Sequence, residues 1–405
     1  MKNSPPLFPP DRCTGCMTCI EFCSPKALKP VIDEYGILRV KLDNALCIHC
    51  NRCSDICPVL HAASWSRPKE EPLVFAAWAK EQTIRQQGAT AGIFGALAAE
   101  IVRNGGCAFG AVQEGVRVLH RCCETSNELS FLQGSKYQQG NITGIHAAVL
   151  ALLKNGRTVL FSGVPCQVAG LLAFLKNKNY SGTCLTVDLI CGGFSSAFPM
   201  DFYLAKHPDF KEIVSFRDKK EGWKPSGYRY NLTVRTQNND IVCQGDNNLV
   251  IAAFSSHLFH RPSCEHCQFG TYTRQSDLTI GDFWGDQQHI TEHFNGVSAV
   301  IVHSSQGMKL LQNSRIHLEP ASIEKLINSN PRLLARDLKT VSVSRLEKRI
   351  AYKLLRFSMK HNRDFISFFL KLEMKLLSLR YRLMGKKIQK NNFHIAAKII
   401  NQERT

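Results

Sequence analysis

The chain has 405 residues, of which 44% are hydrophobic and 21% charged, an ordinary composition for a globular protein of two or three domains. The first residues, MKNSPPLFPP, lack the apolar segment of a signal peptide, and no apolar run approaches the ~18 residues that cross a membrane. Seventeen cysteines without an export signal favour metal or redox chemistry in a reducing cytosol over a disulfide framework. We therefore expect a cytoplasmic metalloprotein.

The net charge of +18 is concentrated at one end of the chain. Residues 331–405 contain 19 Lys and Arg against 5 Asp and Glu, a net charge of +14, so the other 330 residues carry only +4. The basic character therefore belongs to the C-terminal segment, and the rest of the chain is almost balanced.

Near the N-terminus, two runs of cysteines share the spacing C-x2-C-x2-C-x3-C: CTGCMTCIEFC (13–23) and CIHCNRCSDIC (47–57). Three closely spaced thiolates can surround one face of an iron–sulfur cube, and in two-cluster ferredoxins the fourth ligates the other cluster. Pro25 and Pro58 end the two runs. The spacing assigns one 4Fe-4S cluster to Cys13, Cys16, Cys19 and Cys57, and a second to Cys47, Cys50, Cys53 and Cys23.

Zinc is the alternative occupant, because C-x2-C pairs also build zinc ribbons, but zinc favours two separated pairs over a duplicated triplet plus one. Between the runs, YGILRVKLD (35–43) alternates apolar and polar residues and predicts a strand. Residues 9–60 resemble a bacterial-type two-cluster ferredoxin domain. Such a domain moves single electrons, so a site that exchanges them with a substrate is expected elsewhere in the chain.

The next segment predicts a linker, a strand, a loop of small residues and a helix. Residues 61–72 are polar with two prolines, 73–79 (LVFAAWA) form a strand candidate, and 93–106 are apolar with helical periodicity. The loop between them contains Gly88, Thr90 and Gly92. Small residues before a helix let the backbone approach a phosphate, although they also serve close helix packing.

A similar alternation of helices and strands follows. The predicted elements are a helix at 143–156, a strand at 157–163, a helix at 164–175 and a strand at 185–193. This order favours an α/β domain, in which ligands bind at the carboxyl ends of strands. Cys166 and Cys191 both lie at such strand ends.

Another C-x2-C pair, Cys264 and Cys267, occurs in FHRPSCEHCQFG (259–270). Together with Cys166 and Cys191 it supplies four thiols, enough for a third 4Fe-4S cluster, although Cys166 and Cys191 are also compatible with buried, small apolar side chains. The remaining cysteines are interpreted as ordinary core thiols: Cys107, Cys122, Cys123, Cys184 and Cys243.

Residues 74 to about 310 resemble the coenzyme F420 hydrogenase/dehydrogenase β-subunit family, and with the ferredoxin unit the resemblance covers about three quarters of the chain. The matching segments are LQGSKYQQGNI (132–142), VLFSGVPCQVAGL (159–171), VDLICGG (187–193), FRDKKEGW (216–223), RPSCEHCQF (261–269) and SDLTIGDFWG (276–285). The resemblance implies an FAD-containing oxidoreductase core that also holds a 4Fe-4S cluster. It implies electron transfer between the deazaflavin coenzyme F420, or another reduced cofactor, and iron–sulfur partners.

The resemblance also points to a cofactor-binding set and to two departures. The set comprises Gly88, Thr90, Gly92, Ser135, Lys136 and Tyr137. Lys136 would neutralise the FAD pyrophosphate or tune the flavin, and its alternative role is that of a solvated loop lysine. GATAG (88–92) replaces the Ser-Ser-Ser-Gly-Gly that members often carry, and Cys191-Gly192-Gly193 replaces Cys-His-Gly. The second change removes an imidazole, so the identity of the hydride partner stays open.

The tail (345–390) predicts helix with apolar stripes between basic positions. It would contact an anionic membrane surface or a partner protein, and it resembles no nucleic-acid recognition module, so no nucleic-acid partner is expected. The residues predicted to form the lipid face and its basic flanks are Ile366, Phe369, Leu370, Leu376, Leu377, Lys371, Lys375 and Arg380. The protein would then be cytoplasmic and peripheral to the inner face of the membrane.

We therefore predict an α/β fold with α+β elements. Its parts are a small ferredoxin-type domain (1–67), a larger α/β flavin domain in two halves (68–155 and 156–320) and a basic helical tail (321–405). The predicted function is a flavin- and iron–sulfur-dependent oxidoreductase with an electron-transfer partner protein. A non-catalytic electron-transfer subunit of a larger enzyme system, membrane-associated or concerned with polysaccharide, is the alternative.

Overall fold

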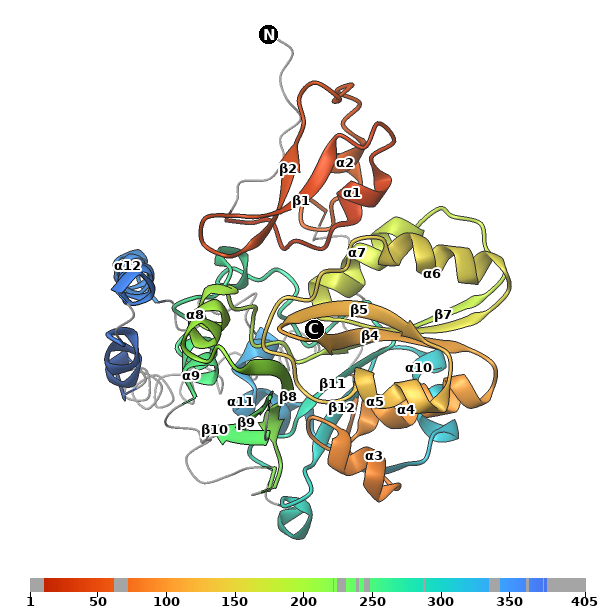
Figure 1. Cartoon of the computed structure of the whole chain (residues 1–405). Helices are drawn as coiled ribbons and strands as arrows, with labels where there is room; N and C mark the ends of the chain where they lie inside the picture. The colour runs from red at the N-terminus through yellow and green to blue at the C-terminus, as the bar shows by residue number, and fades with distance from the viewer. Residues whose placement is uncertain are drawn as a thin grey trace, which may run out of the picture.

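The computed structural model describes residues 11–61, 72–220, 222–223, 231–237, 240–243, 248–286, 288–334, 343–361, 364–373 and 375–376. A small N-terminal unit stands on one side of a larger α/β body, and the C-terminal helices flank that body (Figure 1). The predicted linker lies almost entirely outside the described residues.

The N-terminal unit has ferredoxin-like symmetry. Its elements are α1 (Thr18–Phe22), β1 (Leu28–Ile32), β2 (Leu38–Leu42) and α2 (Arg52–Asp55). β1 and β2 pair antiparallel, which confirms the predicted strand at 35–43. Each cysteine loop leads into one of the helices, and equivalent residues are left-handed in both: Gly15 and Met17 in the first, His49 and Asn51 in the second. The two loops, which share one cysteine spacing, thus adopt the same backbone conformation.

The α/β body is built on a mixed sheet whose described strands lie in the order β13-β3-β12-β11-β7-β6-β4-β5. Their bounds are β3 (Leu73–Ala79), β4 (Cys107–Glu114), β5 (Arg117–Cys123), β6 (Thr158–Ser162), β7 (Thr183–Leu189), β11 (Leu278–Asp282), β12 (Ser298–Val302) and β13 (Ile316–Ala321). β4, β6, β7 and β11 run parallel, and antiparallel strands flank them. Strands from both sides of residue 155 therefore share one sheet.

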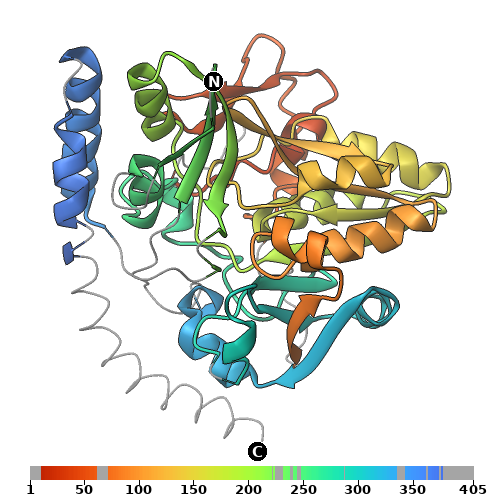
Figure 2. The same cartoon turned by 60° about the horizontal axis from the view of Figure 1, so that its bottom comes forward.

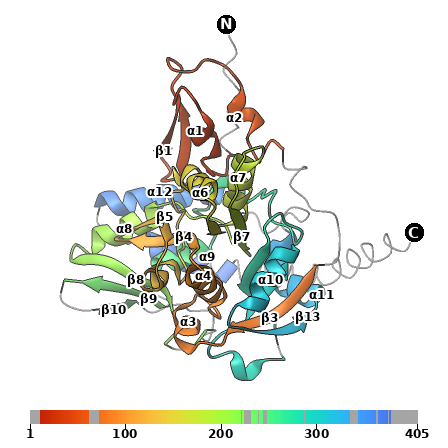
Figure 3. The same cartoon turned by 90° about the vertical axis from the view of Figure 1, so that its right-hand side faces the viewer.

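Helices cover both faces of this sheet (Figure 3). They are α3 (Gln82–Gln87), α4 (Ile93–Arg103), α5 (Leu129–Leu132), α6 (Ile145–Lys154), α7 (Pro165–Leu175), α10 (Ser305–Asn313) and α11 (Ile323–Ser329). Apolar residues of α4, α5 and α10 pack on one face and those of α6 and α7 on the other. The strands and helices predicted between residues 73 and 193 are confirmed with small shifts at their ends.

The ferredoxin-like unit shares a hydrophobic core with the sheet. Met17 and Ile20 of its first loop and helix pack in the same cluster as Val168 and Leu171 of α7. Since α1 also lies against α6 and α7, the unit rests on that pair of helices, as Figure 3 shows. This shared core fixes the unit's position on the α/β body.

A smaller sheet and two helices form another edge of the body. β8 (Phe210–Asp218), β9 (Asn231–Thr236) and β10 (Asp240–Cys243) pair antiparallel, and α8 (Phe198–Lys206) packs with α9 (Leu249–Ser255).

α12 (Arg345–His361) and the helical residues 366–373 pack beside α8 and α9 (Figure 2). Ile366 and Leu370 are buried at 0% and 1% exposure, in a cluster with Leu355 of α12 and Leu249 of α9. The prediction that Ile366 and Leu370 face lipid is therefore wrong, because the protein itself covers this apolar stripe. Leu377 and Arg380 lie outside the described residues, and within those residues no helix is long and apolar enough to span a bilayer.

Candidate cofactor and cluster sites

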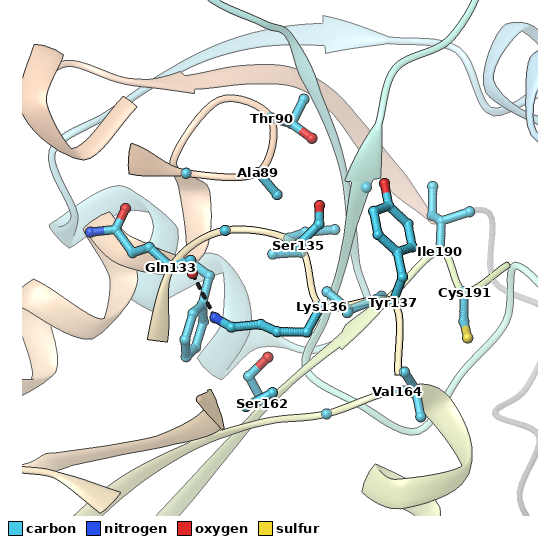
Figure 4. A pocket seen from close by; sticks show the side chains of 18 of the residues that line it. Ala89, Thr90, Gln133, Ser135, Lys136, Tyr137, Ser162, Val164, Ile190 and Cys191 are labelled. Carbon is cyan, nitrogen blue, oxygen red and sulfur yellow. Dashed lines mark hydrogen bonds between the residues drawn. The ribbon is translucent and has the colours of Figure 1, made fainter. Parts of the chain in front are cut away.

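A cavity of about 300 Å³ opens at the carboxyl edge of the parallel strands (Figure 4). Its walls are the loop into α4, residues 133–138, and the ends of β6, β7 and β11. All six residues predicted to bind a cofactor line it: Gly88, Thr90, Gly92, Ser135, Lys136 and Tyr137. The cavity thus lies at the strand ends, where α/β sheets place ligands.

The loop into α4 has a compact form that requires glycine at position 92. Gly92 has φ +74°, and a Cβ there would lie 2.6 Å from the Ile84 carbonyl oxygen. Lys219 Nζ donates to the Arg85 carbonyl at 2.6 Å and to the Thr90 carbonyl at 2.7 Å. Residues 92–95, at the start of α4, line the cavity, and the free N–H groups of a helix N-terminus suit a phosphate.

Asp282, at the end of β11, accepts hydrogen bonds from several polar groups, one of them on this loop. Arg217 Nη1 lies 2.8 Å from Asp282 Oδ2, and the Arg217 side chain is only 3% exposed. Thr90 and Trp223 donate to Asp282 Oδ1. Arg217 also lines the cavity, so a buried cation sits beside the glycine loop.

Lys136 is bonded to main-chain oxygens at the end of α5. Its Nζ donates to the Gln133 carbonyl at 2.6 Å, as Figure 4 shows, and to the Phe131 carbonyl at 3.2 Å. Burial lowers the pKa of Lys136 to about 7. In this conformation main-chain oxygens hold the ammonium group, and its predicted contact with a pyrophosphate stays a prediction.

His120 of β5 is a cavity residue that sequence reasoning missed. It is 6% exposed and lines the cavity with Ser162 and Gly163. Burial is the main reason that its pKa falls to about 4, so the imidazole is neutral at physiological pH. The only sequence signal was the alternation of RVLHRCC, in which His120 falls on an inward position.

Cys166, Cys191, Cys264 and Cys267 converge beside this cavity. All four line one small space, and burial, with the three neighbouring cysteines adding to it, raises the pKa of Cys166 well above its ordinary value. The Gly193 N–H donates to Cys191 Sγ at 3.3 Å, and the Phe194 N–H donates to Cys264 Sγ at 3.4 Å. We call these residues the inner thiol set.

The inner thiol set fits an iron–sulfur cluster. Burial is the main cause that raises the pKa of Cys191 to about 12, and the neighbouring Cys264 thiol adds to it. Buried thiols that repel one another become thiolates when a cationic centre binds them, and backbone N–H groups directed at sulfur support that charge. Cys191 lines both the cavity and the space between the four thiols.

In the ferredoxin-like unit, Cys13, Cys16, Cys19 and Cys57 line a cavity of about 280 Å³ together with Cys53. Cys16 is buried, and Thr18 Oγ1 donates to its sulfur at 3.4 Å. Burial, reinforced by the Cys16 thiol, raises the pKa of Cys57 to about 11. This arrangement fits the predicted first cluster.

The thiols of the predicted second cluster lie nearer to solvent. Cys50 is exposed, and Cys23, Cys47 and Cys53 are half-buried. Burial is the main cause that raises the pKa of Cys53, and the nearby Cys50 adds to it. The spacing predicts that the fourth cysteine of each run ligates the cluster of the other run. Cys57, the fourth cysteine of the second run, lines the same cavity as the cysteines of the first loop.

Arg261 of the α/β body forms hydrogen bonds with the ferredoxin-like unit beside its first cysteine loop. It is 1% exposed, and its guanidinium donates to the Cys13 carbonyl at 2.7 Å, the Leu38 carbonyl at 2.5 Å and Gln139 Oε1 at 2.8 Å. Its Nη2 also lies 3.7 Å from Cys13 Sγ. Arg261 precedes Cys264 by three residues, so it links the first cysteine loop to the inner thiol set.

Helix α7 is a second connection between the first cysteine loop and the inner thiol set. A Cβ at Gly170 would lie 2.9 Å from Cys16 Cβ, so the loop packs directly on the helix. Gly170 is one helical turn from Cys166. Thr14 also lines the space between the four inner thiols.

Two parts of the chain match known protein families. Residues 156–324 match the family model for the C terminus of the coenzyme F420 hydrogenase/dehydrogenase beta subunit, and residues 12–60 match the 4Fe-4S dicluster domain. A solved structure of the F420-reducing NiFe hydrogenase complex from Methanosarcina barkeri, studied by xenon derivatization, contains a similar chain. That chain is 16% identical, the match covers 72% of this chain and 96% of the other, and the TM-score is 0.44. No curated protein matches the chain significantly.

The site therefore has the organisation of an electron-transfer oxidoreductase with iron–sulfur centres. More particularly, the chain joins a 4Fe-4S dicluster domain to a domain of the coenzyme F420 hydrogenase/dehydrogenase β-subunit family, which confirms the resemblance.

Proposed function

We propose that this protein is a flavin- and iron–sulfur-dependent oxidoreductase that passes electrons between a hydride-type donor and its 4Fe-4S clusters. The observation that carries the proposal is the position of Cys191, which borders both the cavity and the inner thiol set. A cofactor in the cavity would be next to a ligand of the third cluster, so electrons would cross only a short gap.

The cavity suits FAD on two grounds. The N-terminus of α4 provides positive potential for a pyrophosphate, and Arg217, which is paired with Asp282, lines the same cavity. The small residues Gly88, Ala89, Ala91 and Gly92 also line it and let the main chain approach a ligand closely. Bound flavin would accept two electrons from a hydride donor and release them one at a time.

The residues around the cavity would position the flavin and keep its environment dry. Lys219 supports the glycine loop through two main-chain carbonyls, and Asp282 orients Arg217. His120 contributes a neutral imidazole to an apolar wall that includes Leu132. Gly192 and Gly193 also line the cavity, and a Cβ at Gly192 would lie 3.2 Å from the Phe254 ring.

Beyond the cavity, the proposed path follows the thiol sets outward. It runs from the inner thiol set through the contact between α7 and Cys16 to the first ferredoxin cluster, and then to the second. Cys50 is exposed, so a partner protein would exchange electrons there. Coenzyme F420 or another reduced cofactor would be the donor, and the same path would also serve the reverse direction.

The test uses the full chain, purified anaerobically and reconstituted with iron, sulfide and FAD. Reduced deazaflavin, NADH and NADPH are offered in turn with a viologen dye as acceptor. Stoichiometric flavin and turnover with one donor are the expected results. Cys191→Ser should keep the flavin and lose dye reduction that depends on the clusters.

Two outcomes distinguish the alternatives. Bound flavin without turnover of any donor would identify a non-catalytic electron-transfer subunit whose partner enzyme performs the chemistry. Failure to bind flavin would reject the proposal for the cavity while leaving the cluster assignments intact.

A further inference from the structure

A second group of metal-ligating side chains lies on β4 and β5, beyond the part of these strands that lines the cavity. Cys107 is the first residue of β4, and Cys122 and Glu124 lie at the end of β5. One ligand atom from each of them, two sulfurs and a carboxylate oxygen, lies within 4.8 Å of the other two. His120 of β5 lines the cavity and lies two residues from Cys122, so at ~3.3 Å per residue about 7 Å of strand separates the two sites.

The register of the β4–β5 hairpin produces this convergence. Phe109 pairs with Cys122 and Ala108 with Cys123, so Cys107 and Cys122 point to the same face of the sheet. The two sulfurs lie within 4.8 Å of each other, and the Cys107 thiol also donates to the Thr158 carbonyl at 3.9 Å. Cys107 is buried, Cys122 is half-buried and Glu124 is exposed, so an ion could enter from the Glu124 side.

Arg157 completes the charge balance of this group. Its Nη1 lies 2.6 Å from Glu124 Oε1, and its Nη2 donates to the Gly105 and Gly106 carbonyls at 3.3 Å each. Such an outer partner orients a ligating carboxylate and leaves its second oxygen available. Two thiolates, one carboxylate, one guanidinium and a divalent cation sum to zero charge.

We propose that Cys107, Cys122 and Glu124 bind one zinc ion, with solvent as the fourth ligand. Zinc is bound by thiolate and carboxylate ligands in tetrahedral geometry, and an S2O donor set with an open position matches that preference. The hard cations magnesium and calcium prefer oxygen ligands alone and do not suit two sulfurs.

The ion would fasten β5 to the rest of the sheet. β5 is the last strand in the order β7-β6-β4-β5, and it carries His120 and Val118, which line the cavity. A metal bridge at its end would restrain this edge strand and so stabilise the cavity wall from a distance.

The experiment measures metals in the anaerobically purified holoprotein and in matched variants. About one zinc per chain is expected in addition to iron, after dialysis against buffered zinc. Zinc K-edge absorption should report two sulfurs at ~2.3 Å and oxygen ligands at ~2.0–2.2 Å, and it is insensitive to iron. Cys122→Ser should lower zinc affinity by at least about tenfold while iron and flavin contents stay unchanged.

Two further variants separate ligation from folding. Glu124→Gln alters an exposed side chain and should also weaken zinc binding without unfolding the protein. Cys184→Ser is the control, because Cys184 lies on the same face two strands away, across Val159 from Cys107, and it should retain zinc.

Three results would overturn the proposal. One is the absence of zinc at saturating buffered concentration. Another is a zinc shell of four sulfurs, which would indicate occupation of an incomplete cluster site. The third is a disulfide between Cys107 and Cys122, detected as a protein mass 2 Da below that of the reduced chain, which would show that the two cysteines form a redox pair and not a zinc site.

Discussion

The two cysteine loops of the ferredoxin-like unit have the same spacing and the same left-handed positions, yet they occupy different surroundings. The first loop packs on α7 and receives the Arg261 guanidinium, and Cys16 within it is buried. The second loop carries Cys50 and Ile48 at the protein surface, where Ile48 is 67% exposed.

This difference indicates that ligand geometry and electron-transfer role have separate origins. Local backbone conformation makes each loop able to hold a cluster, whereas on our proposal the contact with the neighbouring domain decides which cluster would receive electrons from the interior. On our proposal the first loop faces the inner thiol set and the second faces a partner protein.

The largest expected effect comes from the inner thiol set, which the first loop contacts. The intact protein should hold about twelve iron and twelve sulfide, and Cys264→Ser should remove about four of each because three thiolates hold a cluster poorly. Iron analysis and electron paramagnetic resonance should find the ferredoxin pair unchanged. Eight iron in the unaltered protein, or no loss in the variant, would refute the third cluster; Cys184→Ser is the matched control.

Next in size is a difference in lability between the two loops. Under mild oxidant with a chelator, the cluster of the exposed second loop should lose its iron first, since solvent reaches Cys50 but not Cys16. Spectra recorded during the treatment would follow the two signals separately. Simultaneous loss would mean that the difference in burial does not protect the first cluster.

Arg261→Gln should shift the two clusters unequally. Removing a buried positive charge beside Cys13 makes the reduced first cluster less stable, so its potential should fall, by ~60 mV for each tenfold change in the one-electron equilibrium. The second cluster should move little. Redox titration monitored by electron paramagnetic resonance measures both, and Arg261→Lys should retain part of the effect. Equal shifts in the potentials of both clusters would indicate that the substitution destabilises the protein generally and does not act on the first cluster.

Burial, which distinguishes the two loops, also acts on Lys136 in the cavity. Its pKa is lowered from 10.5 to about 7 by burial, so between pH 7 and 10.5 the unfolded chain holds a proton that the folded chain lacks. The free energy of unfolding of flavin-free protein should rise with pH across this window, by at most ~1.4 kcal/mol per pH unit for this group. Denaturation of Lys136→Met should have a shallower slope, and exposed Lys154→Met should not. Equal slopes in all three proteins would contradict the assignment.

The smallest effect concerns the C-terminal tail. Because Leu355 and Ile366 are part of the core, truncation before α12 would destabilise the body, but deletion of 377–405 should leave cluster and flavin contents unchanged. That segment carries seven Lys and Arg against one Glu. If it binds anionic vesicles, the deletion should abolish cosedimentation, and salt should weaken binding by the full chain. No binding at low salt would leave a protein partner as the tail's target.

Sequence by itself determined what depends on neighbouring residues. The spacing of Cys13, Cys16 and Cys19 specifies a cluster loop, since the ligands are placed by a few backbone dihedrals. Strands such as 73–79 and the helix at 93–103 followed from apolar periodicity and from the glycines that bound them.

The tertiary structure decided what depends on residues that are distant in the chain. Arg261 meets Cys13 across 248 positions, and Arg217 meets Asp282 across 65. The sequence indicated that Cys107 and Cys122 are ordinary core thiols, and only the register of the β4–β5 hairpin shows that they lie beside Glu124. Likewise, the apolar stripe at Ile366 and Leu370 looked suited to lipid, and only packing on α9 and α12 showed that the protein covers it. Periodicity specifies that a face is apolar, whereas the choice of what buries that face depends on the whole fold.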